Sequence, residues 1–178
     1  MEKLENYISL EKLEVVCNSI EEAHGLPNEC YLEGGYTKFE RKLLFEDKWV
    51  VIGVASNLKQ KGEAVPFNLL GIPLIILKDK NDKIRVFHNV CSHRGYKLLN
   101  EPCKIKNALR CPYHSWAYDL NGKLVSTPHI GGMDKNDADG FVKSRSDLIE
   151  VRSYVWLDMI FINISVSYTH LTLPTSND

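Results

Sequence analysis

Two short loops that mix cysteine and histidine constrain this chain more than any other feature. The first reads CSH at residues 91–93 and the second reads CPYH at residues 111–114, so each offers one thiolate and one imidazole a few residues apart. Thiolates and imidazoles are ligands that proteins use for iron and zinc. A fold that uses both loops for one metal site must present them together at one end of a scaffold.

The pattern predicts a Rieske [2Fe-2S] cluster. In such a centre two cysteines bind one iron and two histidines bind the other, so each loop supplies one ligand to each metal. We therefore expect Cys91 and Cys111 on one iron, and His93 and His114 on the other. With two ferric ions, two sulfides, two thiolates and two neutral imidazoles, the oxidised cluster carries no net charge. Its reduction potential is therefore higher than that of a four-cysteine cluster.

Zinc is the alternative metal, because two cysteines and two histidines also form structural zinc sites. Zinc fingers usually pair like with like, with two cysteines in one loop and two histidines in the other. Here each loop mixes the two residue types, and a proline follows Cys111. The pattern therefore favours the iron-sulfur cluster over zinc.

Three segments resemble the Rieske domain of ring-hydroxylating oxygenase α subunits: HNVCSHRG at residues 88–95, CPYHSW at 111–116 and DLNGKL at 119–124. Respiratory Rieske proteins instead carry an extra cysteine in each loop, joined by a disulfide, and the equivalent positions here are Tyr96 and Tyr113. The resemblance thus implies the low-potential oxygenase or ferredoxin branch. Ser115 stands where the family usually has glycine, so its backbone must adopt a conformation that serine tolerates.

The resemblance also implies a function. An NAD(P)H-dependent reductase or a ferredoxin would reduce the cluster, which passes electrons to a mononuclear Fe(II) in the adjacent subunit of a homotrimer. There O2 is activated for hydroxylation or demethylation of a small organic substrate. That iron belongs to a catalytic domain whose two-His-one-carboxylate ligands match no position here, so we expect the domain to be missing and assign no catalytic residue. The alternative is a free-standing Rieske ferredoxin-type electron carrier.

Two residues beside the loops are expected to support the cluster. Arg94 follows the first histidine and would hold loop or partner carboxylates, and Trp116 follows the second loop and would shield the cluster from water. Cys103 lies between the loops but has no histidine at the right offset, so we exclude it as a ligand. His88 precedes the first loop on a predicted strand and is expected to be structural.

The segment of residues 1–48 is expected to be helical. Residues Leu10 to Ala23 carry apolar side chains at helical spacing, with Ser9 in the N-cap position and a Gly-Leu-Pro stop at residues 25–27. A second helical run, rich in charge, covers residues 37–45. Cluster binding does not require such elements, so they argue against a minimal electron carrier.

From Trp49 onward the pattern changes to short β-strands, and the expected fold class is mainly β. Strands are predicted over residues 49–55, 73–79, 83–89, 108–111, 116–118 and 123–125, followed by a loop over 131–146 and a closing pair over 148–153 and 154–164. Residues 79–82 and Asn121-Gly122 are predicted turns. We therefore expect an antiparallel Rieske domain over residues 49–165, preceded by the N-terminal helical segment.

Charge and hydropathy restrict the partners. The 178 residues include 22 Lys and Arg and 23 Asp and Glu, a formal net charge of −1, so we expect no nucleic-acid and no membrane partner. Apolar runs such as PLIIL at 73–77 are too short to span a bilayer, and the start lacks an apolar leader. We expect a cytoplasmic protein in which Cys17, Cys30 and Cys103 are reduced thiols.

The last residues, 166–178, read VSYTHLTLPTSND and do not continue the strand pattern. Ten of them, VSYTHLTLPT, can be written in codons that match a transposase-based sequencing adapter. We therefore expect this tail to be adapter-derived and not native, so that the parent protein continues into the missing catalytic domain. A genuine β-type tail is the alternative.

Overall fold

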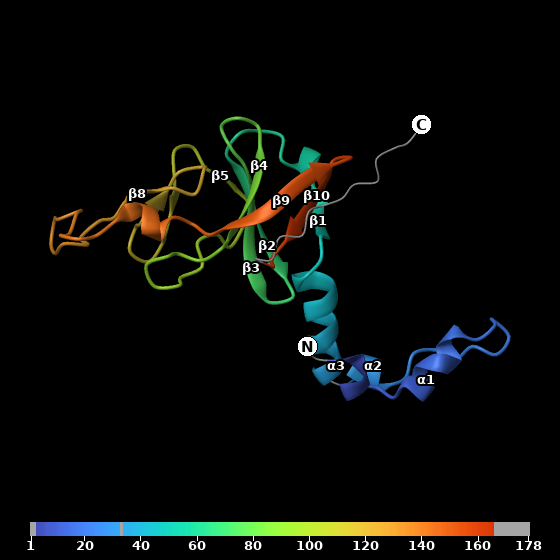
Figure 1. Ribbon diagram of the computed structural model, residues 1–178. Helices are drawn as coiled ribbons and strands as arrows, with labels where there is room; N and C mark the ends of the chain where they lie inside the picture. Colours follow the sequence, from blue (N-terminus) through green and yellow to red (C-terminus); the bar gives the residue numbers. More distant parts are fainter. Residues whose placement is uncertain (1–2, 33, 166–178) are drawn as a thin grey trace. The chain divides into compact units, whose positions relative to one another are not determined.

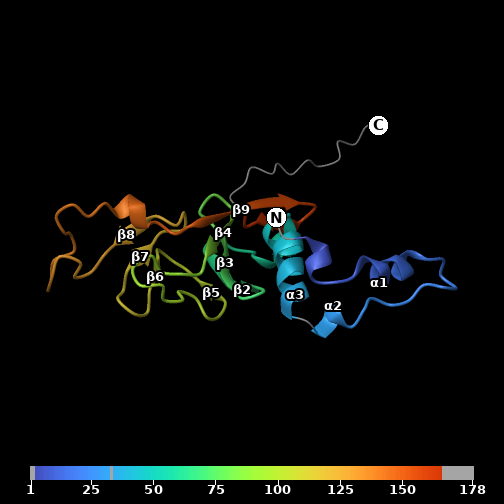
Figure 2. The same ribbon diagram turned by 60° about the horizontal axis from the view of Figure 1, so that its bottom comes forward.

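The computed structural model describes residues 3–32 and 34–165, so the predicted adapter-derived tail lies outside the described residues. The chain divides into an N-terminal unit that ends at Lys48 and a β unit from Trp49 to Ile164. Figures 1 and 2 show the β unit from two directions, with the strands of its larger sheet in teal, green and orange to red and those of its smaller sheet in olive to gold.

The N-terminal unit consists of short helices, which in chain order are η1 (Leu4–Asn6), α1 (Leu10–Glu14), η2 (Val15–Cys17), α2 (Glu29–Leu32), α3 (Gly34–Glu40) and η3 (Arg41–Glu46). The prediction over residues 37–45 is confirmed by α3 and η3. The single helix predicted from Leu10 to Ala23 is wrong beyond Cys17, where Asn18 becomes extended. Ile20 is 90% exposed, so no buried apolar face stabilises a longer helix there.

The β unit contains a large antiparallel sheet with the strand order β1-β10-β9-β4-β3-β2-β5. A small three-stranded sheet in the order β6-β7-β8 lies at the end away from β1 and β10 (Figures 1 and 2). The strands are β1 (Val50–Val54), β2 (Glu63–Leu69), β3 (Ile72–Lys78), β4 (Ile84–His88), β5 (Cys103–Lys104), β6 (Leu109–Arg110), β7 (Ala117–Tyr118), β8 (Leu124–Ser126), β9 (Glu150–Trp156) and β10 (Met159–Asn163). The 3-10 helices η4 (Ala55–Asn57) and η5 (Lys143–Ser146) lie in the connections.

Strand β3 is buried on both faces, which explains its uninterrupted apolar sequence. On one face Ile75 and Leu77 belong to the core beneath the small sheet. On the other face Ile76 lies near Ile160 of β10, because an added Cβ at Gly53 would be 3.8 Å from a methyl carbon of each. The large sheet therefore curls so that β3 contributes to two cores.

Two strands and one boundary were not predicted. Strand β2 contains Pro66, which normally speaks against a strand, but β2 pairs with β5 only at Glu63 and Ala64, so Pro66 lies on an open edge where no ladder donor is needed. Strand β5 is only two residues long. The closing pair turns at Leu157 and Asp158, not between residues 153 and 154, so that boundary was wrong.

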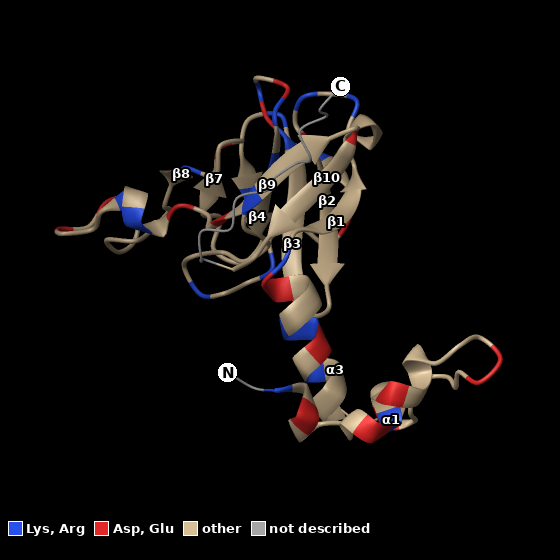
Figure 3. Cartoon of the chain, turned by 45° about the vertical axis from the view of Figure 1, so that its right-hand side comes forward, with Lys and Arg blue, Asp and Glu red and all other residues tan. Residues whose placement is uncertain are grey.

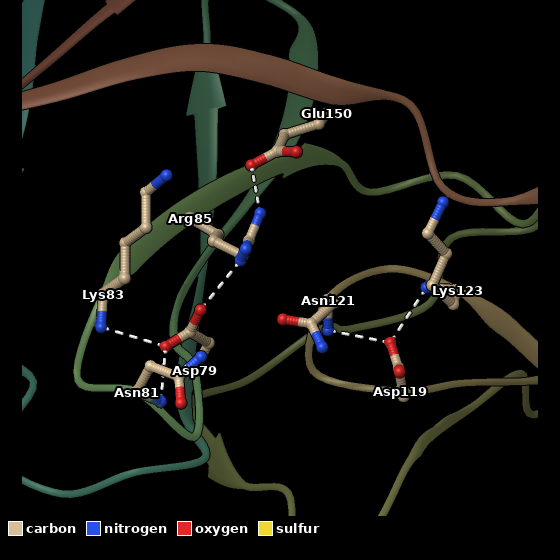
Figure 4. Close-up of polar contacts among 8 residues, drawn as sticks. All are labelled: Asp79, Asn81, Lys83, Arg85, Asp119, Asn121, Lys123 and Glu150. Carbon is tan, nitrogen blue, oxygen red and sulfur yellow. Dashed lines mark hydrogen bonds and ion pairs between the residues drawn. The ribbon is translucent and has the colours of Figure 1, made fainter.

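The predicted turns at residues 79–82 and at Asn121-Gly122 belong to two hairpins built in the same way (Figure 4). In the first, Asp79 Oδ1 accepts hydrogen bonds from the backbone N–H of Asn81 and Lys83, at 2.8 and 2.9 Å. In the second, Asp119 Oδ1 accepts the equivalent bonds from Asn121 and Lys123, also at 2.8 and 2.9 Å. An aspartate therefore pins each turn by satisfying two backbone donors.

The second hairpin packs against the large sheet through a glycine. Gly122 has φ +78°, and a Cβ at this position would lie 2.5 Å from the Phe87 ring of β4. Its carbonyl oxygen accepts a hydrogen bond from Leu148 N at 2.8 Å. Only glycine fits both the left-handed backbone and this close approach, so the small sheet is held in a fixed position on the large one.

Candidate metal centre

The two predicted ligand loops have the same backbone frame. In the first, Cys91 N donates to Tyr96 O at 2.8 Å and Gly95 N donates to Cys91 O at 2.9 Å. In the second, Cys111 N donates to Trp116 O at 2.7 Å and Ser115 N donates to Cys111 O at 3.0 Å. Two chain segments with unrelated flanking sequences thus form matching tight loops.

The matching frame explains the unusual Ser115. Gly95 has φ +69° and Ser115 has φ +59°, so both occupy the left-handed region at the fourth position after the cysteine. Glycine adopts this conformation readily, whereas serine is strained there. The sequence-based expectation that Ser115 needs an unusual backbone conformation agrees with this geometry.

The loops bring the four predicted ligands together in two layers. Cys91 and Cys111 are each 2% exposed and belong to the apolar core between the sheets. His93 and His114 lie nearer the surface, with ring centroids 4.7 Å apart and ring planes at 67°. A buried pair of thiols and an outer pair of imidazoles is the division of ligands that a Rieske cluster requires.

The protonation states fit metal ligation. Burial, followed by electrostatic repulsion from its neighbours, lowers the pKa of His93, which favours the neutral imidazole. Its Nδ1 is buried and has no hydrogen-bond partner among the described residues. Burial raises the pKa of the Cys91 thiol, with the neighbouring Cys111 thiol adding to the effect. A metal cation would reverse this, because coordination deprotonates a thiol.

The first loop is held by a hydrogen-bond network that the sequence did not reveal. The Tyr118 hydroxyl lies 3.2 Å from Cys91 Sγ and accepts from Ser92 N at 3.2 Å. Burial, followed by the hydrogen bond to Cys91, raises the pKa of Tyr118, so the phenol stays protonated. Ser92 Oγ donates to Ser146 O and lies 2.8 Å from the Tyr118 hydroxyl, so the single phenol proton has two acceptors, Ser92 Oγ and Cys91 Sγ. An ionised sulfur is the stronger acceptor of the two.

Asn89 is a second residue that sequence reasoning missed. It is fully buried, and its side chain accepts from Leu98 N and Leu99 N at 3.0 and 2.9 Å and donates to Leu99 O at 2.7 Å. These bonds tie the chain before the first loop to the chain after it. In the sequence, only its position between a predicted strand and Cys91 could have drawn attention to Asn89. Its burial, which is unusual for an asparagine, is visible only in the structure.

Both loops lie within a segment that matches a known domain family. The sequence profile of the Rieske [2Fe-2S] domain matches residues 48–145, which is more than half of the chain and includes both loops. The chain belongs to the Rieske [2Fe-2S] domain family. Membership implies a [2Fe-2S] cluster, and the buried thiols, the neutral His93 and its unpaired nitrogen fit that group.

Relatives of this Rieske domain are subunits of oxygenases. The carnitine monooxygenase oxygenase subunit of Escherichia coli K12 is 28% identical over 153 residues, which cover 86% of this chain and 40% of that protein. The biphenyl dioxygenase subunit alpha of Paraburkholderia xenovorans is 29% identical over 139 residues, covering 76% and 30%.

Solved structures agree with these relatives. The crystal structure of the quaternary ammonium Rieske monooxygenase CntA in complex with its substrate gamma-butyrobetaine has 27% identity and a TM-score of 0.72, covering 81% of this chain and 40% of that one. The chain therefore matches the N-terminal part of Rieske oxygenase alpha subunits. It spans about 40% of the length of the first curated relatives.

The two residues predicted to support the cluster both lie beside the predicted ligand histidines. Trp116 is 4% exposed and stacks on the His93 ring, with centroids 4.5 Å apart and planes at 9°. Arg94 is exposed and lines a surface cavity of about 520 Å³ together with His93, His114 and Trp116. The stacked indole covers one side of His93, whereas the cavity leaves the other parts of the histidine edge accessible.

The remaining candidates, Cys103, His88 and His129, do not belong to the predicted ligand set. Cys103 is on the exposed two-residue strand β5. His88 is half-buried on β4, where burial lowers its pKa. His129 lines the same cavity as the ligand histidines, but its Nδ1 already accepts from Asp134 N at 3.0 Å.

Two features are absent from the described residues. Among residues 3–32 and 34–165, no three His, Cys, Asp or Glu side chains converge as a site for a single metal ion would require. Two ligands for each iron is instead what a binuclear cluster needs. The same residues include no helix that is long and apolar enough to cross a bilayer.

Proposed function

We propose that the chain is the electron-entry domain of an O2-dependent Rieske oxygenase that acts on a small organic substrate. In this proposal Cys91 and Cys111 hold one iron, and His93 and His114 hold the other. The cluster supplies a one-electron carrier that an NAD(P)H-dependent reductase or a ferredoxin can reduce. The next carrier would be the mononuclear iron of the parent oxygenase.

One observation carries the proposal: the two loops share a backbone frame and place two thiols inside and two imidazoles outside. A tetrahedral zinc site would instead gather all four ligands around one point. The relatives that match most of this chain are oxygenase subunits, one acting on carnitine and one on biphenyl. These relatives support an oxygenase. Their substrates differ in chemistry, so we propose no particular substrate.

The chain's own residues determine how this centre would work. Tyr118 would donate a hydrogen bond to the Cys91 sulfur and so stabilise the negative charge that arrives with an electron. Trp116 would exclude water from one side of His93. The histidine pair, being nearer the surface than the thiols, would form the edge through which electrons enter and leave.

The test is anaerobic reconstitution with iron and sulfide, followed by metal analysis and a redox titration. We expect about two irons and two sulfides per chain and a one-electron midpoint potential within the Rieske range of roughly −150 to +300 mV. A colourless protein with one zinc per chain would contradict the proposal. So would a potential near −400 mV, which is typical of four-cysteine plant-type ferredoxins.

A further inference from the structure

The connection from β8 to β9 is held in place at both ends. We call residues 127–147 the β8–β9 segment, which is gold to orange in Figures 1 and 2. Near its start, Thr127 Oγ1 donates to Asn136 O at 2.8 Å, and Thr127 has no exposed surface. At its end, Asp147 Oδ1 accepts from Leu124 N at 2.7 Å. The segment therefore has a defined course, although η5 is the only helix or strand that the structure describes in it.

Phe141 stands out in this segment because its ring is partly buried. Figure 3 shows acidic and basic residues along the segment, which is polar at most positions. Phe141 and Ile130 nevertheless pack against the core that contains both predicted cysteine ligands. Phe141 also contacts Trp116 of that core edge-on, with ring centroids 5.7 Å apart and planes at 65°. It therefore connects the segment to the residue that follows the second ligand loop.

Trp116 in turn contacts His93 of the first loop. The indole and imidazole planes are nearly parallel, at 9°, and their centroids are 4.5 Å apart. His114 meets the same imidazole at 4.7 Å and 67°. His93 Nδ1 is buried without a hydrogen-bond partner in the described part of the chain, so no hydrogen bond at this atom fixes the rotation of the ring. Its orientation depends on the aromatic contacts instead.

These contacts form a series from the segment to a proposed ligand. An edge-to-face pair, Phe141 and Trp116, leads to a stacked pair, Trp116 and His93. Both geometries are arrangements that aromatic rings prefer, and Trp116 is 4% exposed, so the indole has little room to turn. Without the Phe141 ring, a space would open beside the indole, and Trp116 would be free to tilt away from His93.

A second pair of this kind lies away from the ligand loops. Phe161 of β10 and Trp156 of β9 have ring centroids 6.3 Å apart and planes at 51°. Within the described residues, Trp156 has no ring contact with a histidine. The two pairs thus have the same residue types but different neighbours, because only Trp116 contacts a predicted ligand. The consequences of losing each phenylalanine should therefore differ.

We propose that Phe141 is a positioning residue for the cluster, because it holds the Trp116 indole against His93 and so fixes the orientation of that proposed ligand. Groups around a metal-binding histidine set the orientation of its ring and thereby tune the metal. This inference rests on the proposed function, since the orientation of His93 matters only if His93 binds iron. Phe141 acts only through Trp116, and no bond is made or broken. The β8–β9 segment would then belong to the support of the metal centre.

The test is pulsed EPR of the reduced, cluster-loaded full chain with ¹⁵N-labelled histidine. The wild type should show couplings to two histidine nitrogens. Phe141→Ala should shift or broaden one coupling and leave the other unchanged, because only the His93 ring loses its support. An iron chelator should also remove the cluster roughly tenfold faster, which is the lower end of the effect on metal affinity of losing a group that supports a ligand. Phe141→Tyr, which keeps the ring, should retain both couplings and the wild-type rate.

Two controls separate orientation from packing. Ile130→Ala removes another side chain through which the segment contacts the core, and Phe161→Ala removes the ring from the second pair. Both variants should keep the two couplings of the wild type. Equal shifts in Ile130→Ala and Phe141→Ala, or equal shifts of both couplings in Phe141→Ala, would overturn the positioning role. Unchanged couplings in Phe141→Ala would overturn it as well.

Failure to bind a cluster is distinguishable from failure of the positioning role. If Phe141→Ala takes up no cluster, Phe141→Leu is measured in its place, because leucine keeps an apolar side chain without the ring, and the same change in one coupling is expected. A wild-type chain that never takes up a cluster contradicts the proposed function. A loaded wild type whose couplings neither substitution alters contradicts only the positioning role.

Discussion

The large sheet and the cluster end of the β unit are stabilised in different ways. The sheet has strands of five to seven residues apart from β5, and Leu74, Ile75, Val86, Ile160 and Ile162 are completely buried in it. Strands β6, β7 and β8 have only two or three residues each. The cluster end therefore relies on side-chain hydrogen bonds, on close packing at Gly122 and, in our proposal, on the metal centre.

Because of this difference, we expect folding of the large sheet and binding of the cluster to be only partly coupled. A sheet with its own apolar core can form without iron, so it provides a fixed base. The cluster end shares a core with that base, and this shared core includes both Cys91 and Cys111. We therefore expect changes in the loops to alter the cluster without unfolding the sheet. Changes at sheet residues outside the shared core, such as Leu74, should alter stability without altering the cluster.

The largest expected effect is the loss of the cluster when a ligand is removed. Cys111→Ser should lower the iron content from about two atoms per chain to nearly none, since a hydroxyl replaces a required thiolate. The far-UV circular dichroism of the sheet should be retained. Cys103→Ser is the matched control, because Cys103 lies exposed on β5, and it should keep the full iron content. An iron-loaded Cys111→Ser protein would contradict the assignment.

The next effect concerns the sheet alone. Leu74→Ala removes a side chain with no exposed surface and should lower the free energy of unfolding by about 3 kcal/mol through lost burial and a cavity. Urea denaturation measures this, and the visible spectrum of the folded protein should not change. Ile149→Ala, at a position that is 69% exposed, should change stability by less than about 0.5 kcal/mol. A changed cluster spectrum in Leu74→Ala would show that the two regions are not separable.

The buried Asp79 turn should make the sheet sensitive to acid. Burial by itself would raise the pKa of Asp79, but hydrogen bonds from Arg85 and from the N–H groups of Lys83 and Asn81 outweigh it and lower that pKa. The stabilisation is therefore complete above the unfolded value of about 3.9 and disappears as the pH falls through the lower folded value. Asp79→Asn should cost about 2 kcal/mol at pH 7.

Asp119 provides a matched comparison for the stability cost of Asp79→Asn. Asp119 pins an equivalent turn at the cluster end but has no ion pair among the described contacts. Asp119→Asn should therefore cost less, about 1 kcal/mol or below. Urea denaturation from pH 7 to pH 3 measures both variants, and the deficit of Asp79→Asn should shrink toward acid pH. Equal costs for the two variants would mean that the Arg85 pair contributes nothing.

A smaller effect is expected on the reduction potential. Tyr118→Phe keeps the ring but removes the hydroxyl 3.2 Å from Cys91 Sγ. Loss of a hydrogen bond worth about 1 kcal/mol should lower the midpoint potential by about 40 mV, because the reduced centre carries more negative charge. Tyr154→Phe, on an exposed ring of β9, is the control for the titration. An unchanged potential in Tyr118→Phe would show that the hydroxyl does not tune the cluster.

The smallest effect distinguishes the two loops. Ser115→Gly should stabilise the protein by about 0.5 to 1 kcal/mol, because φ +59° strains a residue with a Cβ. Gly95→Ala should do the opposite in the first loop, where the added methyl meets no neighbour and only the backbone conformation is strained. Thermal unfolding of the cluster-loaded protein measures both changes. Destabilisation by Ser115→Gly would show that the serine has a role beyond its backbone.

Features with a local cause could be predicted from the sequence. The predicted ligand residues stand in two short motifs, which the structure brings together. The Asp-x-Asn turns and the runs that form β1, β3 and β4 have strong local signals. Ser115 could be identified through the family resemblance, because it stands where that family usually has glycine. The turn and strand predictions depend on a few neighbouring residues, so tertiary contacts did not change them.

Features that depend on distant contacts could not be predicted. Pro66 argues against a strand unless one knows that β2 has an open edge beyond Ala64. The turn at Leu157 and Asp158 uses positive φ angles of 47° and 66° without any glycine, so no turn signal marks it. Tyr118 becomes important only because β7 brings it beneath Cys91, 27 residues away in the chain.

The most direct test of the central claim is pulsed EPR of the reduced, cluster-loaded chain, with and without ¹⁵N-labelled histidine. Our assignment predicts a rhombic signal with couplings to two histidine nitrogens, which change on labelling and are lost in His93→Ser and His114→Ser. A signal without histidine couplings would mean that the iron has other ligands. A protein that gives no signal and contains zinc would show that His93 and His114 do not belong to an iron-sulfur centre.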